Sequence, residues 1–117
     1  MEDTRYKGDK GENFAADLLK RKGYKIIERN FRTKIGEIDI IAKDKDIVSF
    51  IEVKTRWSQK YGKPEEAVTP RKIYKIKRVI DYYFLTHDMK RDKVKIEVVA
   101  IDARRLGILS YKIIRLD

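Results

Sequence analysis

The chain has 117 residues, contains no cysteine and one histidine, and carries 29 Lys and Arg against 19 Asp and Glu. This length predicts one domain over residues 1–117, and the composition excludes disulfides, cysteine nucleophiles, cysteine-ligated zinc and multi-histidine metal sites. The net charge of +10 favours a polyanionic partner, with a merely lysine-rich surface as the alternative. No apolar run is long enough for a membrane span or a signal peptide, so we expect a cytoplasmic protein without membrane contact.

The predicted elements follow from spacing and from start and stop signals. In chain order they are a helix over 9–22, strands over 24–31, 37–42 and 47–55, a helix over 70–86, and strands over 93–103 and 110–115. Gly23 ends the first helix, and Thr69-Pro70 starts the second with a hydroxyl cap before a proline. The polar residues 43–46 indicate a hairpin, and residues 56–63 indicate an exposed loop.

The order of these elements predicts an α/β fold in which helices cover the sheet. Both faces of the central strands are apolar, as in a sheet buried on both sides. The residues predicted on one face are Ile38, Ile40, Ala42, Ile51 and Val53, and those on the other are Ile41, Val48 and Phe50.

Charged residues interrupt the two hairpin strands, where an unpaired charge is expensive to bury. A turn centred between residues 44 and 45 places Glu37 opposite Glu52 and Asp39 opposite Phe50. Because side chains alternate along a strand, Glu37, Asp39, Glu52 and Lys54 then share one face. A turn of odd length would put the two pairs on opposite faces. The even turn therefore predicts a cluster of three acids and one lysine.

Such a cluster is suited to a divalent cation, since hard oxygen ligands without His or Cys favour Mg²⁺ or Mn²⁺. Asp39 and Glu52 are the candidate ligands, and the main-chain carbonyl of Val53 is a third. Lys54 would orient an attacking water or stabilise a phosphate in its transition state. The alternative is a cross-strand salt bridge in which Lys54 only neutralises Glu52.

Other residues are weaker candidates for the same site. Glu12 lies beside the apolar stripe of the first helix and either reaches the cluster or only satisfies the helix dipole. Lys72 sits in the first turn of the second helix, an unfavourable place for a cation, which hints at a phosphate contact. Arg56, Trp57 and Tyr61 could bind nucleic acid by stacking on bases, or Trp57 could simply cover the end of the sheet.

Asp39, twelve intervening residues, and then Glu52-Val53-Lys54 form a pattern that resembles the PD-(D/E)xK nuclease superfamily, which includes Holliday junction resolvases. A longer match, over roughly residues 7–101, resembles the YraN-like family of small bacterial proteins. It rests on Gly11-Glu12 with Ala15 and Ala16, Gly36-Glu37-Ile38-Asp39, Glu52-Val53-Lys54-Thr55-Arg56, Tyr61-Gly62, Ala67-Val68 and Lys72.

The resemblance implies a restriction-endonuclease-like αβββαβ core with a central mixed sheet flanked by helices. It implies Asp39 and Glu52 as metal ligands, Lys54 as the catalytic lysine, and Glu12 as the helix-borne acid of resolvase-like members. Glu37 receives no firm role from it. Ile38 stands at the position where the motif often has a proline.

The expected function is therefore a Mg²⁺- or Mn²⁺-dependent nuclease, with DNA favoured over RNA as its substrate and branched DNA as one candidate. Cutting a junction needs two active sites, so a homodimer is expected in that case. One alternative is a non-catalytic nucleic-acid-binding protein that keeps the nuclease fold. Another is an adaptor that binds a protein through Trp57 and the aromatic residues 82–84.

Overall fold

The helices and strands follow the predicted order, with boundaries shifted by a few residues. The computed structural model describes residues 4–57, 68–91 and 93–117. Its elements are α1 (Thr4–Arg21), β1 (Lys25–Arg32), β2 (Glu37–Asp44), β3 (Ile47–Arg56), α2 (Pro70–Thr86), β4 (Val94–Arg104) and β5 (Gly107–Arg115). Most of the predicted loop at 56–63, including Tyr61, lies outside the described residues.

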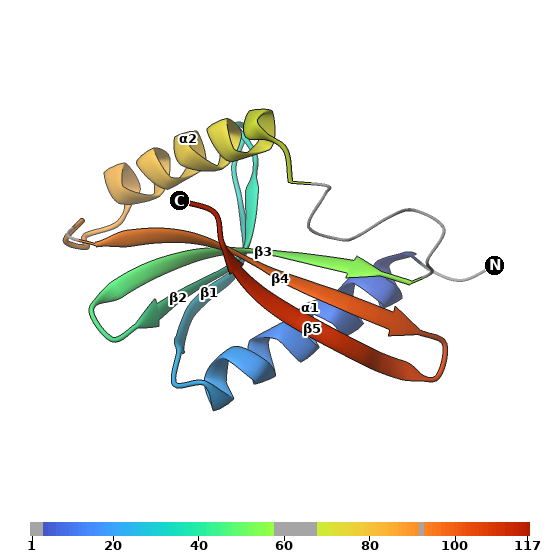
Figure 1. The fold of residues 1–117 in the computed structure, drawn as a ribbon. Helices are drawn as coiled ribbons and strands as arrows, with labels where there is room; N and C mark the ends of the chain where they lie inside the picture. Colours follow the sequence, from blue (N-terminus) through green and yellow to red (C-terminus); the bar gives the residue numbers. More distant parts are fainter. Residues whose placement is uncertain (1–3, 58–67, 92) are drawn as a thin grey trace.

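The strands form one sheet in the order β1-β2-β3-β4-β5. Neighbouring strands are antiparallel except for β3 and β4, which are parallel. Parallel neighbours need a long crossover connection, and the segment that contains α2 joins β3 to β4 (Figure 1). The fold is therefore α/β, and the prediction of a mixed sheet is confirmed.

Each face of the sheet packs against one helix (Figure 1). The cluster on the α1 side consists of Ala15, Ala16, Leu18, Leu19, Ile40, Ala42, Ile51, Val99, Ile101 and Ala103. The cluster on the α2 side consists of Ile38, Ile41, Val48, Phe50, Ile76, Val79, Ile80, Tyr83 and Ile96. Neither described helix is long and apolar enough to cross a bilayer.

The hairpin of β2 and β3 has a different register from the predicted one. Ile41 lies opposite Phe50 rather than Val48, and Asp44 lies opposite Ile47. The turn is therefore centred between Lys45 and Asp46, one residue later than predicted, and Lys45 adopts a φ of 57°. Because the register moves by two residues, the paired side chains between Ile40 and Ile51 keep their predicted faces while their partners change.

The alternation of side chains along β2 breaks at Asp39. Ile38 was predicted to share a face with Ile40, but Ile38 packs on the α2 side and Ile40 on the α1 side. The connecting end of β1 and β2 rises beside α2 (Figure 1), and a β-carbon at Gly36 would lie 3.3 Å from Cγ2 of Val79. This bend removes Asp39 from the regular alternation and separates it from Glu37.

Candidate functional site

The candidate site forms where the ladder between β2 and β3 stops. The last backbone pair in that direction is Ile40 with Ile51. Beyond it, Oδ2 of Asp39 accepts a hydrogen bond from the backbone N–H of Val53 over 2.7 Å. The N–H and C=O of one strand residue point to the same side, so the carbonyl of Val53 also faces this gap. The side chain of Asp39 and the carbonyl of Val53 thus lie at the same side of β3.

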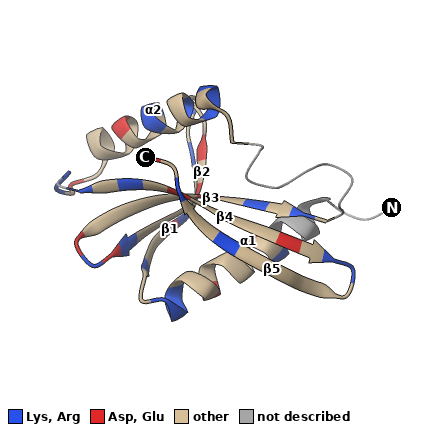
Figure 2. Cartoon of the chain, in the orientation of Figure 1, with Lys and Arg blue, Asp and Glu red and all other residues tan. Residues whose placement is uncertain are grey.

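Glu52 is held by two lysines from different elements. Its side chain is 10% exposed, and its Oε1 lies 3.3 Å from Nζ of Lys54 and 3.0 Å from Nζ of Lys72. Lys72 comes from the first turn of α2, where its backbone N–H donates to the hydroxyl of the cap residue Thr69. Figure 2 colours the basic residues blue, including those at the start of α2. The residues that start α2 therefore also aim Lys72 at β3.

The pKa of Asp39 is raised far above that of an ordinary aspartate. Burial raises its pKa to about 7, and the charges of Glu52 and, more weakly, Glu12 act in the same direction. The hydrogen bond from Val53 and the charge of Lys54 oppose this rise. The carboxylate of Asp39 is therefore short of positive charge, as expected of a group that would gain from a nearby cation.

The two lysines differ in how readily they lose a proton. Burial and the adjacent ammonium of Lys72 lower the pKa of Lys54, and Glu52 offsets them only in part. For Lys72, burial opposes the charge, but hydrogen bonding with Lys54 and Glu52 outweighs burial and raises the pKa. Lys54 is thus the lysine better suited to orient or deprotonate a water.

Glu12 lies on the α1 side and is positioned by β1. Its side chain is 11% exposed. Its Oε1 forms an ion pair with Nη2 of Arg29 at 3.1 Å and accepts a hydrogen bond from Nδ2 of Asn30 over 3.0 Å. Asn30 has a φ of 56°, a conformation that Asn tolerates better than most residues. Neither partner was predicted, and the adjacent polar residues Arg29 and Asn30 within β1 were the available signal.

The three acids do not form a preassembled metal centre. Within the part of the chain that the structure describes, no three Asp, Glu or His side chains lie close enough together to hold an ion. The predicted convergence of Glu12, Asp39 and Glu52 on one ion is therefore not present in this arrangement. A smaller set fits, because Mg²⁺ commonly takes one or two carboxylates and keeps waters for its other positions. That set is Asp39, Glu52 and the carbonyl of Val53.

Glu37, predicted to share the acidic face, lies outside this cluster. Its side chain is 62% exposed and its Oε2 lies 3.5 Å from Nε of Arg32. The bend at Asp39 explains the separation, because it breaks the alternation on which the shared face depended.

Arg56 and Trp57, predicted to bind nucleic acid, both contact the protein itself. Nη2 of Arg56 lies 2.6 Å from Oδ2 of Asp102 on β4. Trp57 is partly buried against the cluster on the α1 side, with Nζ of Lys10 6.0 Å from its ring centroid. The packing of Trp57 agrees with the alternative of covering the end of the sheet, and the prediction of nucleic-acid binding stays a prediction.

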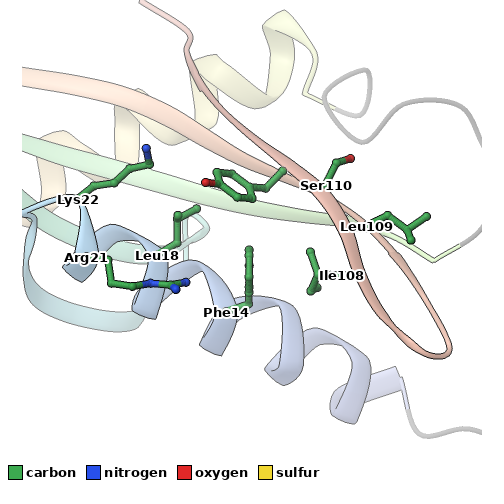
Figure 3. Close-up of a pocket in the computed structure, with 8 residues that line it drawn as sticks. Phe14, Leu18, Arg21, Lys22, Ile108, Leu109 and Ser110 are labelled. Carbon is green, nitrogen blue, oxygen red and sulfur yellow. The ribbon is translucent and has the colours of Figure 1, made fainter.

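A separate groove of about 660 Å³ lies between α1 and β5 (Figure 3). Its lining residues are Phe14, Leu18, Arg21, Lys22, Ile108, Leu109, Ser110 and Tyr111. No acid lines it, and β3 and β4 separate β5 from β2 in the sheet. The groove is therefore distinct from the site around Asp39.

Fold and site together define a small α/β protein with two acids and two lysines beside a split in its sheet. The model of the uncharacterised protein family UPF0102 matches residues 11–101, and the chain belongs to this family. The matched stretch contains Glu12, Asp39, Glu52, Lys54 and Lys72. The match confirms the resemblance to the YraN-like family.

Individual relatives are similar over most of their length. A UPF0102 protein of Clostridium acetobutylicum is 47% identical over 94 residues, which cover 80% of this chain and 77% of that protein. One from Persephonella marina is 41% identical over 95 residues, covering 81% and 82%. One from Thermodesulfovibrio yellowstonii is 48% identical over 99 residues, covering 85% and 88%.

Proposed function

We propose that this chain is a metal-dependent nuclease of the PD-(D/E)xK kind that hydrolyses phosphodiester bonds in DNA, including branched DNA. The observation that carries the proposal is the meeting of Asp39 with Val53 and of Lys54 with Glu52 where β2 and β3 part. The element order through β4 is αβββαβ, which agrees with a restriction-endonuclease-like core. The net charge of +10 suits a polyanionic substrate.

Each residue has a distinct role in this proposal. Asp39, Glu52 and the carbonyl of Val53 would hold Mg²⁺ or Mn²⁺. A bound ion would supply charge stabilisation at the phosphate and an acidified water as nucleophile. Lys54, whose pKa is lowered mainly by burial, orients that water or takes its proton. Arg29 and Asn30 both contact Oε1 of Glu12. In this proposal the carboxylate of Glu12 orients a second water from the α1 side of the sheet.

The second candidate is a non-catalytic nucleic-acid-binding protein with the same fold. The observation that favours it is the pair of lysines on Glu52, which already neutralises that carboxylate without any metal. The adaptor alternative keeps only part of its surface, because Tyr83 is 1% exposed and packs edge-on against Phe50 in the core, whereas Tyr82 is 42% exposed.

The deciding experiment is a cleavage assay with Mg²⁺ and Mn²⁺ on four-way junction, flap, single-stranded and duplex DNA beside an RNA panel. Asp39→Asn and Lys54→Met remove the proposed ligand and lysine. Lys75→Met removes an equal charge from an exposed position on α2 and serves as the matched control. The nuclease proposal predicts metal-dependent cutting that both site variants lose and the control keeps.

Binding without cutting by every variant would instead support the non-catalytic protein. Cutting of four-way junctions would further require two sites in one complex, so sedimentation of the protein on junction DNA tests the homodimer at the same time.

A further inference from the structure

A second lysine, Lys72, reaches the candidate site from outside the strand motif. Its Nζ lies 3.0 Å from Oε1 of Glu52, nearer than the Nζ of Lys54 at 3.3 Å. We infer that Lys72 is the resident cation of the site, holding Glu52 until a divalent ion binds and then moving to a phosphate oxygen of the nucleic acid. This inference rests on the proposed function and assigns a role to a residue outside the acid-and-lysine motif.

The position of Lys72 on α2 favours an ion pair with Glu52. A cation in the first turn of a helix is unfavourable because the helix dipole is positive there. The first turn of α2 contains no acid that could compensate it. Glu52 on β3 supplies the missing negative charge, so packing of α2 on the sheet brings the lysine and the carboxylate together.

The same oxygen of Glu52 cannot easily serve three cations. Lys54 and Lys72 already share Oε1, and a divalent ion bound to Glu52 would repel both ammonium groups at short range. The side chain of Lys72 is 34% exposed and that of Lys54 is 28% exposed. Lys72 is also anchored on the helix above the sheet rather than on the ligand strand. Lys72 is therefore the cation that can leave while Lys54 stays beside Glu52.

Departure of Lys72 would couple metal binding to substrate binding. A lysine released from Glu52 remains tethered to α2, over the face of the sheet on which Glu52 lies. A phosphate there is the natural new partner for the ammonium. Lys72 would then contribute to nucleic-acid affinity only when a divalent ion occupies the site.

The experiment compares wild type with Lys72→Met, Lys72→Arg and the control Lys75→Met. Mn²⁺ binding is followed by the electron paramagnetic resonance signal of free Mn²⁺ at constant ionic strength. We expect Lys72→Met to bind Mn²⁺ about tenfold more tightly, since the competing cation is gone. Lys72→Arg and Lys75→Met should stay within about twofold of wild type.

A second arm measures binding of duplex and four-way junction DNA with and without Ca²⁺, by fluorescence anisotropy. Lys72→Met should weaken DNA binding about fivefold or more with Ca²⁺ and by less than about twofold without it. Equal weakening in both conditions would overturn the inference and leave Lys72 as an ordinary DNA contact.

The outcomes separate this inference from the proposed function. If Lys72→Met binds Mn²⁺ no more tightly than wild type, while Asp39→Asn abolishes Mn²⁺ binding, the metal site stands and the role of Lys72 is wrong. If wild type and all Lys72 variants fail to bind Mn²⁺ at millimolar concentration, the metal site itself is wrong and both fail together.

Discussion

The carboxylate of Asp39 replaces a backbone partner of Val53, accepting its N–H over 2.7 Å where the ladder of β2 and β3 has ended. A buried N–H without a partner is costly, so this hydrogen bond lets two strands separate without leaving a donor unpaired. It engages Oδ2, so Oδ1 is the oxygen that the proposed metal ion would take. The split in the sheet and the candidate site therefore have one structural cause.

The first prediction concerns the pH dependence of stability. Burial raises the pKa of Asp39 to about 7, so ionisation of Asp39 destabilises the fold progressively as pH rises from about 4 to about 7. Asp39→Asn removes the charge and can keep the hydrogen bond from Val53. We expect this variant to be more stable than wild type by about 2–4 kcal/mol at pH 8 without metal, with the gain vanishing near pH 4.

Urea unfolding at several pH values measures this difference. Asp17→Asn, at an exposed position on α1, is the matched control and should show no such trend. Mg²⁺ should stabilise wild type but not Asp39→Asn, because binding to the native state alone raises stability. A constant difference between Asp39→Asn and wild type from pH 4 to pH 8 would contradict the assignment of an uncompensated carboxylate.

The second prediction separates chemistry from binding at Lys54. Lys54→Met removes the ammonium 3.3 Å from Glu52 but leaves all three candidate metal ligands in place. We expect single-turnover cleavage to fall by about 10²-fold or more. DNA affinity should change by less than about threefold. Lys77→Met, an exposed lysine on α2, should alter neither, and a large loss of DNA affinity in Lys54→Met would indicate a binding role instead.

Much of the fold could be predicted because its signals are local. The cap Thr69 and Pro70 fix the start of α2 at the observed residue, and the apolar spacing of α1 gives its buried face. The hairpin register could not be predicted in the same way. A two-residue turn usually carries Asn or Gly where φ is positive, and here Lys45 takes that conformation without such a signal.

The site was only partly predictable because its decisive contacts join distant segments. The strand pattern indicated Asp39, Glu52 and Lys54. The ion pair from Lys72 depends on where α2 crosses the sheet, and the hold of Asn30 on Glu12 depends on how α1 packs over β1. Tertiary packing determines both contacts, so the spacing of residues along the chain does not predict them.

The third prediction concerns a buried polar cluster that the nuclease proposal does not use. Lys95 Nζ lies 2.8 Å from Asp44 and 3.2 Å from Glu97, and Glu97 accepts from Ser49 at 2.7 Å and Tyr24 at 2.8 Å. Burial opposes the charge on Lys95, yet hydrogen bonding, first with Asp44, raises its pKa. The cluster is thus a satisfied ionic network.

Breaking this network should destabilise the fold without touching the candidate site. Lys95→Met leaves the carboxylate of Glu97 buried and unpaired, at an expected cost of about 3–5 kcal/mol. Ser49→Ala removes one hydrogen bond and should cost about 1 kcal/mol. The double variant Lys95→Met with Glu97→Met should recover part of the loss, because the charge that remains, on Asp44, has a side chain 28% exposed to solvent. Thermal unfolding measures these variants beside Glu97→Met alone, and additive effects of the two single variants in the double variant would argue against a coupled network.

The last prediction tests the close approach of α1 to β3 at Gly11, the residue before Glu12. A β-carbon at Gly11 would overlap Oγ1 of Thr55 on β3, with Cβ of Thr55 3.4 Å away. Gly11→Ala should therefore destabilise by about 1–3 kcal/mol, although alanine favours the helix by up to about 1 kcal/mol.

In a Thr55→Ala background the clash is gone, and Gly11→Ala should become neutral or stabilising. The double-mutant cycle, measured by urea unfolding, should thus give a coupling of at least about 1 kcal/mol between the two positions. Additive effects would mean that α1 stands farther from β3 than the structure places it. The position assigned to Glu12 would then have to move with the helix.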